Sequence, residues 1–301
     1  MMVMALPGDP FASDEAQGSA MPTELPFVDV ARHLSERGVR VPAVYLDATA
    51  DGVLLIEDLG DLQLQDMVRG GDETTVLAWY EAAESFLAKI HRVMWPMPTT
   101  SIAGRRTFGF ELLRWELDHY REWGVEAVFG RLAAPVRDRL DEAFDDFAQE
   151  IDALPKGFVH RDYQSRNLMV LSEVPAMESL SVIDFQDAFI GPRIYDLVAL
   201  LNDSYVSLSW EIKDAVIARY ADHLGLDAAT LEDEFHLVTV QRKLKDGGRF
   251  VFIDRVKNNP GYLGFVEGSF RRAKESLARL SGHEALKRAL EAADPKRFGG
   301  D

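Results

Sequence analysis

Two short segments of the chain carry the side chains that a proton transfer and a bound cation would need. In residues 160–167, the acid Asp162 stands five positions before Asn167, and in residues 183–187 the acid Asp184 ends an apolar run. One carboxylate can accept the proton of an attacking hydroxyl, while an amide oxygen and a second carboxylate can hold Mg²⁺ against nucleotide phosphates. The spacing therefore predicts phosphoryl transfer, with Asp162 as proton acceptor and Asn167 and Asp184 as metal ligands.

His160 and Arg161 precede Asp162 in the order of a kinase catalytic loop, so we assign all three to the catalytic segment. The alternative is that Asp162 and Asn167 cap turns and that Asp184 caps a helix. A lone His-x-Asp would favour that alternative. The presence of both segments, in order and correctly flanked, favours the kinase interpretation.

Apolar runs predict short strands around these segments, and helical spacing predicts a mostly helical remainder. Asn167 should enter a hairpin and Asp184 should leave it, which brings the two metal ligands together. The strands are predicted at residues 41–47, 52–58, 157–160, 168–171 and 180–183. The helices are predicted at residues 24–38, 75–93, 110–123, 135–154, 195–201, 211–224, 231–245, 262–280 and 283–292.

With these motifs the chain resembles the aminoglycoside phosphotransferase/choline kinase group, and within it the bacterial anomeric kinases of N-acetylmuramate and N-acetylglucosamine. The resemblance runs from about residue 24 to about residue 280. The narrower similarity is carried by residues 159–162, 166–169, 182–188, 191–192 and 195–198, by residues 241–245, and by Gly248, Phe250, Tyr262 and Leu263.

The resemblance implies an α+β, protein-kinase-like fold of two lobes. Residues 1–61 would be a partial amino-terminal nucleotide-binding lobe with a loop at 7–23, and residues 62–301 a large, mostly helical lobe for catalysis and substrate binding. ATP and Mg²⁺ would be the cofactors. The acceptor would be a small hydroxylated molecule, best an amino sugar of cell-wall origin phosphorylated at its anomeric hydroxyl; an aminoglycoside or a choline-like alcohol is the alternative.

The amino terminus departs from the family pattern. Residues 3–7 resemble the end of a kinase third strand, with Met4 or Ala5 where many kinases carry lysine, and the two strands around a glycine-rich turn are missing. An internal start codon or a shortened gene would explain this. We therefore expect a truncated amino-terminal β-lobe and weak ATP binding, and a catalytically impaired binding protein is the alternative function.

The resemblance also assigns the nucleotide-binding and supporting residues. Backbone groups around Ile56, Glu57 and Asp58 would hold adenine at the hinge between lobes, although a strand ending in an acidic turn explains the same residues. Asp196 would hydrogen-bond the backbone of the catalytic loop. An acid is also favoured at that position simply because a helix begins there.

Substrate contacts are expected in three places. Asp187 would be a second metal or substrate contact, unless it is an ordinary turn acid. Glu116 and Trp123 lie on a helix that would wall the acceptor pocket. Arg242 and Lys245 could bind an acidic substituent such as a lactyl carboxylate. The competing interpretation of each helix is a solvated, charged face.

Composition narrows the possible partners. The 301 residues include 50 acids and 33 bases, a formal net charge of −17, which argues against nucleic acid or an anionic membrane surface as partner. The chain has no cysteine, no signal-peptide pattern and no apolar run of about 18 residues that could span a bilayer. We therefore expect a cytoplasmic location.

Overall fold

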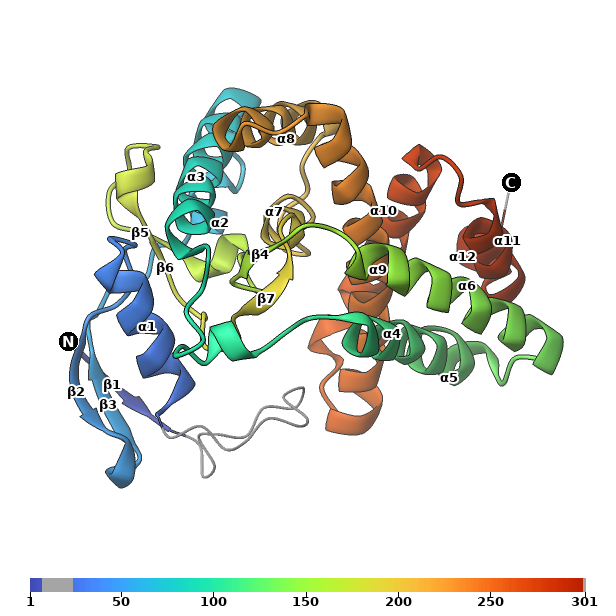
Figure 1. Ribbon diagram of the computed structural model, residues 1–301, viewed down its shortest axis with the longest axis horizontal. Helices are drawn as coiled ribbons and strands as arrows, with labels where there is room; N and C mark the ends of the chain where they lie inside the picture. The colour runs from blue at the N-terminus through green and yellow to red at the C-terminus, as the bar shows by residue number, and fades with distance from the viewer. Residues whose placement is uncertain (7–23, 300–301) are drawn as a thin grey trace. The chain divides into compact units, whose positions relative to one another are not determined.

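The computed structural model describes residues 1–6 and 24–299, so the predicted loop at 7–23 lies outside the described residues. The chain forms two compact units. The first comprises Met1–Thr107 and Lys156–Ala228, and the second comprises Phe108–Pro155 and Ala229–Asp301 (Figure 1). Strands and helices occur together, as predicted for an α+β fold. The division into lobes at residue 61 stays a prediction.

The first unit contains all seven strands of the described residues. It also contains five of the α-helices. The strands are β1 (Met2–Ala5), β2 (Val44–Ala48), β3 (Val53–Ile56), β4 (Lys156–Val159), β5 (Leu168–Val170), β6 (Leu180–Val182) and β7 (Phe189–Pro192). The helices are α1 (Pro26–Glu36), α2 (Leu64–Val68), α3 (Glu73–Met94), α7 (Tyr195–Leu201) and α8 (Trp210–Leu224).

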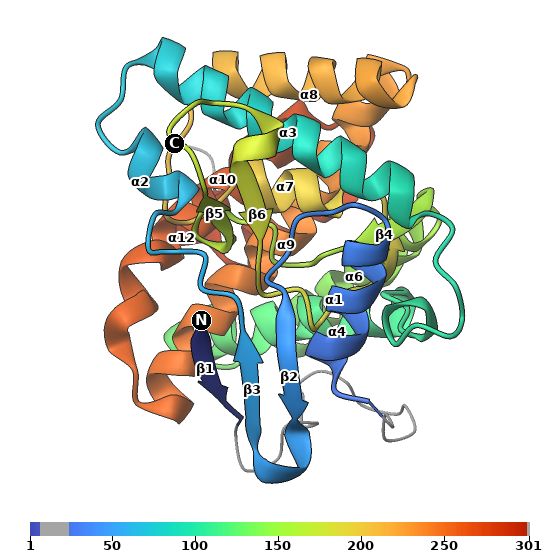
Figure 2. The ribbon, with the colours of Figure 1, turned by 90° about the vertical axis from the view of Figure 1, so that its left-hand side faces the viewer.

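A three-stranded antiparallel sheet has the order β1-β3-β2 (Figure 2). Successive side chains of a strand point to opposite faces, so Leu54 and Ile56 share one face of the sheet. Both are buried. On the other face Val3 and Leu46 both pair with Leu55, and both are largely exposed. The strand expected near residues 3–7 is confirmed as β1, an edge strand that pairs with β3.

The predicted hairpin is confirmed as β5 and β6, which pair from Leu168↔Val182 to Val170↔Leu180. Backbone hydrogen bonds tie both of its edges to the preceding part of the chain. Val170 N–H donates to the carbonyl of Leu62 at 2.8 Å, and Val182 N–H donates to the carbonyl of Arg40 at 3.1 Å. The hairpin is therefore fixed from both sides.

The second unit is entirely helical in its described residues. Its α-helices are α4 (Phe110–His119), α5 (Ala127–Phe129), α6 (Ala134–Asp152), α9 (Ala228–Lys257), α10 (Val266–Arg279), α11 (Glu284–Ala293) and α12 (Pro295–Phe298). A π-helical turn at Tyr120–Glu126 continues α4, where a plain helix to residue 123 was expected. A 3₁₀ helix at Pro260–Phe265 precedes α10, so the helix predicted from residue 262 begins later.

The predicted end of a helix at residue 245 is wrong, because α9 continues to Lys257 through two consecutive glycines. Those glycines serve close packing. A Cβ on Gly248 would lie 2.9 Å from Tyr120 Cα and 3.0 Å from the His119 carbonyl oxygen. A Cβ on Gly247 would lie 2.4 Å from the ring of Phe270. The glycine pair lets α9 approach its neighbours closely and does not end the helix.

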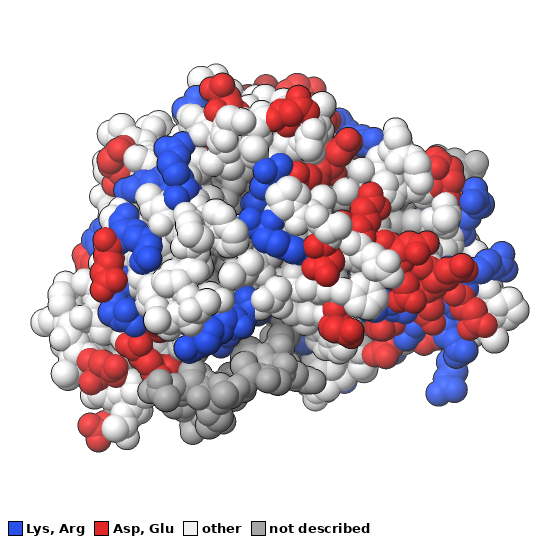
Figure 3. Space-filling model, viewed as in Figure 1, with Lys and Arg blue, Asp and Glu red and all other residues white. Residues whose placement is uncertain are grey.

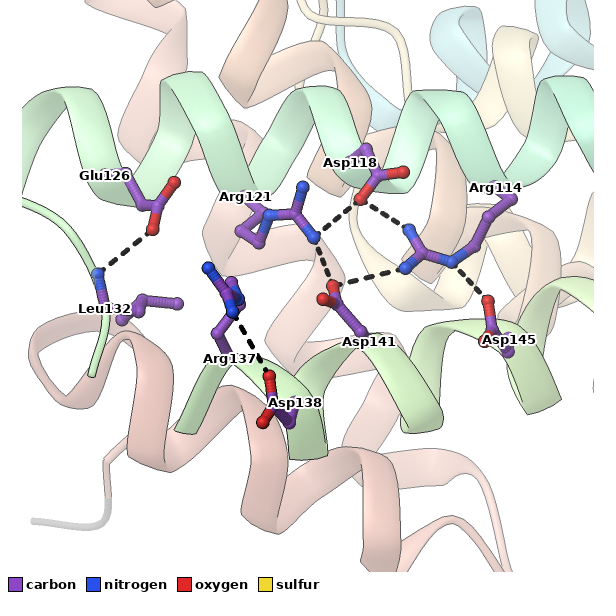
Figure 4. Close-up of polar contacts among 9 residues, drawn as sticks. All are labelled: Arg114, Asp118, Arg121, Glu126, Leu132, Arg137, Asp138, Asp141 and Asp145. Carbon is purple, nitrogen blue, oxygen red and sulfur yellow. Dashed lines mark hydrogen bonds and ion pairs between the residues drawn. The ribbon is translucent and has the colours of Figure 1, made fainter. Parts of the chain in front are cut away.

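Two arginines join α4 and its π-helical extension to α6 (Figure 4). Arg114 contacts Asp118 at 2.6 Å, Asp141 at 3.2 Å and Asp145 at 2.5 Å. Arg121 contacts Asp118 at 2.8 Å and also Asp141. Two cations shared among three carboxylates form a network, which holds helices together better than isolated surface pairs do.

Acidic side chains gather over α6 (Figure 3). Asp138, Glu142, Asp145 and Asp146 are exposed on this helix. Such a surface repels a polyanion. In the part of the chain that the structure describes, no helix is both long enough and apolar enough to cross a bilayer.

We expect Gly248→Ala to destabilise the protein. The added Cβ would meet backbone atoms, which cannot move aside as a side chain can, and overpacking typically costs about 1–3 kcal/mol. That cost should exceed the gain of up to about 1 kcal/mol in helix propensity. Urea unfolding would measure the change.

Gly264→Ala is the matched control, because an added Cβ there meets no atom within 4 Å. Its free energy of unfolding should stay within about 0.5 kcal/mol of the parent, as for most surface changes. Equal stabilities for the two variants would contradict the packing role of Gly248.

Candidate active site

The two predicted catalytic segments each contain a residue in the left-handed backbone region. Arg161 has φ of 83° and Asp184 has φ of 67°. Residues other than glycine rarely adopt this conformation, which costs of order 1–3 kcal/mol and persists only where surrounding contacts enforce it. Such strain clusters at functional sites, so its occurrence in both segments marks this part of the first unit as the candidate active site.

Asp196 enforces the conformation of the catalytic loop. Its carboxylate accepts hydrogen bonds from the backbone N–H of His160 at 2.7 Å and of Arg161 at 2.9 Å. The same carboxylate lies 3.0 Å from Nε2 of His91, whose Nδ1 lies 2.5 Å from the hydroxyl of Tyr220. The expected support of the loop by Asp196 therefore has a geometric basis. Sequence reasoning missed the part of His91, because this residue stands 105 positions before Asp196.

The catalytic loop is also fixed through its side chains. His160 Nε2 lies 3.1 Å from the carbonyl oxygen of Ile183, which joins the two catalytic segments directly. Tyr163 is fully buried and donates its hydroxyl to the carbonyl of Ala83 in α3 at 2.8 Å. Burial raises the pKa of Tyr163 well above its usual value, so this residue acts as a neutral anchor.

Asn167 and Asp184 lie side by side, as the hairpin predicts. The amide nitrogen of Asn167 donates to the Asp162 carbonyl at 2.8 Å and to the Asp184 carboxylate at 3.1 Å. The other Asp184 oxygen accepts from Gln186 at 2.8 Å. Both bonds of Asn167 use its nitrogen, so its oxygen is the atom left to face a cation.

This donor set fits Mg²⁺, which uses one or two protein oxygen ligands and completes its shell with waters and phosphates. Among the described residues there is no group of three or more His, Cys, Asp or Glu that could hold a metal alone. The described residues of the site therefore do not surround a metal ion on their own. It offers one carboxylate and one amide beside the predicted proton acceptor.

Aromatic packing and a buried acid complete the surroundings of the loop. Phe185, which follows Asp184, stacks on Phe27 of α1 with ring centroids 4.9 Å apart. Ser165 donates through both its backbone N–H, at 2.9 Å, and its hydroxyl to the buried carboxylate of Asp203. No sequence pattern indicates a role for Asp203, because an isolated acid after a helix is common.

The predicted adenine-binding residues lie at the end of β3. Glu57 forms a two-pronged ion pair with Arg40, with N–O distances of 2.7 and 2.5 Å, and this bond lowers the pKa of Glu57. The Glu57 N–H is engaged, since it donates to the Ala43 carbonyl at 2.8 Å. Ile56 pairs with its neighbours in the sheet, and Asp58 caps the following turn through Gly60 N–H at 3.1 Å. Adenine binding by this segment stays a prediction.

Asp187 lies between two arginines. Its carboxylate is 3.8 Å from Nη1 of Arg106 and 3.9 Å from Nη1 of Arg161. Arg106 also donates to the carbonyl of Gln186 at 2.8 Å. Asp187 was expected to be a metal contact, a substrate contact or a turn acid. The structure adds a fourth possibility, because this carboxylate lies near two arginines and can bridge them.

The remaining predicted substrate residues lie in the second unit. Glu116 is buried, accepts from Gln241 at 2.7 Å and lies 3.8 Å from Nζ of Lys245, and its burial raises its pKa. Arg242 is buried, so the interpretation of this part of α9 as a solvated face is wrong. Every residue from Glu234 to Leu244 is buried, so the middle of α9 is covered around its whole circumference, which charge counting along the sequence does not reveal.

Trp123 belongs to an aromatic cluster of the same unit. Its ring meets Phe252 edge-on with centroids 5.0 Å apart, and Phe252 also contacts His119 at 5.2 Å. Burial, assisted by nearby Arg249 and Lys245, lowers the pKa of His119 to about 4. At neutral pH His119 is therefore uncharged. The guanidinium carbon of Arg249 lies 5.1 Å from the centroid of the Phe252 ring, so the cluster already contacts a cation.

Comparisons with known proteins show the family of this chain. The Phosphotransferase enzyme family matches residues 13–233. The N-acetylmuramate/N-acetylglucosamine kinase of Pseudomonas aeruginosa is 32% identical over 263 residues, which are 84% of this chain and 73% of that protein. The kinase of the same name from Neisseria meningitidis serogroup B is 32% identical over 274 residues, or 82% and 78% of the two chains.

Solved structures show the fold. The GDP complex of wild-type aminoglycoside 2'-phosphotransferase-IIIa superposes with a TM-score of 0.58 and 18% identity, covering 84% of this chain and 81% of that one. The predicted protein-kinase-like fold is thereby confirmed. With the family match spanning most of the chain, and relatives 32% identical over more than four-fifths of it, this chain belongs to the phosphotransferase enzyme family.

Proposed function

We propose that this phosphotransferase uses ATP and Mg²⁺ to phosphorylate the anomeric hydroxyl of N-acetylmuramate and N-acetylglucosamine in the cytoplasm, as a step of cell-wall sugar recycling. The observation that carries the proposal is the contact of Asn167 with both Asp184 and the backbone of Asp162, under a loop strained at Arg161. The names of the 32% identical relatives support the acceptor.

In the proposed reaction, the anomeric oxygen attacks the γ-phosphorus, and its proton passes to the carboxylate of Asp162. A new O–P bond forms while the bond between the γ-phosphorus and the β–γ bridging oxygen breaks, which releases ADP. A bound Mg²⁺ held by Asn167 and Asp184 would neutralise phosphate charge. His160 contacts the carbonyl of Ile183 and so holds the segment of Asp162 beside the segment of Asp184.

We further propose that residues 1–61 bind the nucleotide, with adenine held near Ile56, Glu57 and Asp58, and that residues 62–301 carry catalysis and the acceptor. In the second unit, Glu116 would accept hydrogen bonds from sugar hydroxyls, and the Trp123 ring would pack on the pyranose. Arg242 and Lys245 would supply positive charge for a lactyl carboxylate. Asp187 would set the arginines beside the phosphates.

Replacement of the proton acceptor tests the mechanism. Asp162→Asn should lower kcat by about 10²–10⁴, the usual cost of removing a general base, while the melting temperature stays near that of the parent. The assay is coupled ADP release with each amino sugar. Asp51→Asn, an exposed acid of the same unit, is the control and should retain full activity. Activity of Asp162→Asn within a few-fold of the parent would remove Asp162 from the reaction.

Replacement of Asp184, the predicted metal-binding carboxylate, tests the cation site. Asp184→Ala should abolish Mg²⁺-dependent binding of ATP, because the site then keeps a single oxygen ligand. Titration calorimetry with and without Mg²⁺ measures this. Glu173→Ala, an exposed acid in the turn of the same hairpin, should bind MgATP normally. Unchanged MgATP affinity in Asp184→Ala would contradict the assignment.

Comparison of the two acceptors tests the carboxylate contact. A charge-assisted hydrogen bond contributes about 1.5–3 kcal/mol, so Lys245→Met should raise KM for N-acetylmuramate about 10-fold or more. KM for N-acetylglucosamine, which lacks the lactyl group, should change little. Lys257→Met, at the exposed end of α9, is the control. Equal effects on both sugars would assign Lys245 to the fold of the unit and not to the substrate.

A further inference from the structure

Phosphoryl transfer needs positive charge beside the nucleotide phosphates, and kinases commonly supply part of it from a strand lysine. The strands β1, β2 and β3 read MVMA, VYLDA and VLLI, with neither lysine nor arginine. In the first unit, the cations that lie beside the residues following Asp184 are Arg106 and Arg161, both near Asp187.

Arg106 is held in place by backbone and side-chain contacts. Its carbonyl accepts a hydrogen bond from Ile190 N–H at 2.9 Å, and Thr107 continues the contact as a parallel bridge to Ile190. Its Nη1 donates to the carbonyl of Gln186, two residues beyond Asp184, at 2.8 Å. The guanidinium is therefore fixed on the segment that carries the metal acid.

The charge of Arg106 is only loosely compensated. Its side chain is 17% exposed, and the carboxylate of Asp187 is 3.8 Å away, beyond hydrogen-bond distance. Burial lowers the pKa of Arg106 more than Asp187 and Asp29 raise it, although the group stays charged at neutral pH. The hydrogen bond that Arg106 makes with the described residues uses Nη1 alone, so Nε and Nη2 keep donors for a ligand.

We propose that Arg106 is a further catalytic residue, whose guanidinium binds the phosphates of the nucleotide and stabilises the charge of the transferred phosphoryl group. The proposal rests on the proposed function of this site. Arginine suits the role because its planar fork of donors matches phosphate oxygens and its charge persists at all physiological pH values. Asp187 would then position Arg106 and Arg161 and separate their like charges.

The neighbouring arginine provides a matched control. Arg105 is exposed and ends the 3₁₀ turn Ala103–Arg105, directly before Arg106. Calorimetry with the Mg²⁺ complex of AMP-PNP and with adenosine would compare Arg106→Gln, Arg106→Lys and Arg105→Gln with the parent protein. We expect Arg106→Gln to weaken AMP-PNP binding about 10-fold or more, leave adenosine binding unchanged and lower kcat. Arg106→Lys should recover part of the loss, and Arg105→Gln should match the parent.

Three results would overturn the proposal. Equal weakening of AMP-PNP and adenosine would show that Arg106 only supports the fold. Unchanged AMP-PNP binding would place it away from the phosphates. A loss of kcat/KM confined to N-acetylmuramate, with AMP-PNP affinity intact, would assign it to the acceptor carboxylate. The calorimetry with AMP-PNP and adenosine contains no acceptor. If the protein phosphorylated neither sugar, the proposed acceptor would be wrong, but the calorimetry would still test the role of Arg106.

Discussion

The buried carboxylate of Asp196 holds the catalytic loop in a conformation that the loop would not adopt alone. A buried charge is costly unless its oxygens are hydrogen-bonded, and here the partners are two loop N–H groups and His91. The same bonds keep Arg161 at φ 83°, so the carboxylate and the strained backbone stabilise each other. The backbone carbonyl of Asp162 follows in this loop, and Asn167 connects that carbonyl to the carboxylate of Asp184.

A second constraint concerns how charge is distributed. The chain carries a net charge of −17, yet its proposed chemistry requires it to bind an anionic nucleotide. Some of the acidic side chains form structural ion pairs, as in the network of Arg114 and Arg121 in the second unit. In the first unit, two arginines share Asp187 near the metal acid. The local arrangement of charged side chains therefore bears on nucleotide binding more directly than the net charge of the chain does.

The sequence predicted those parts of the site that depend on neighbours along the chain. The hairpin around Asn167 and Asp184 and the helix at 195–201 follow from short apolar runs and turns, and the structure contains them. The strand at the amino terminus was expected from the family resemblance, and the structure contains it too. The sequence could not predict contacts between distant segments, such as His91 with Asp196, 105 positions apart, or Arg106 with Gln186. It also misplaced the end of α9, because a glycine pair can either end a helix or allow close packing, and the letters alone do not distinguish the two.

The central claim is that this site moves a phosphoryl group to an anomeric oxygen, and the product itself tests it most directly. The protein would be incubated with MgATP and N-acetylglucosamine labelled with ¹³C at C1, and the mixture followed by ³¹P and ¹³C NMR. The account predicts a new sugar phosphate whose phosphorus couples to the labelled C1, together with an equal amount of ADP. A phosphate attached at another carbon, or ADP formed without any sugar phosphate, would contradict it.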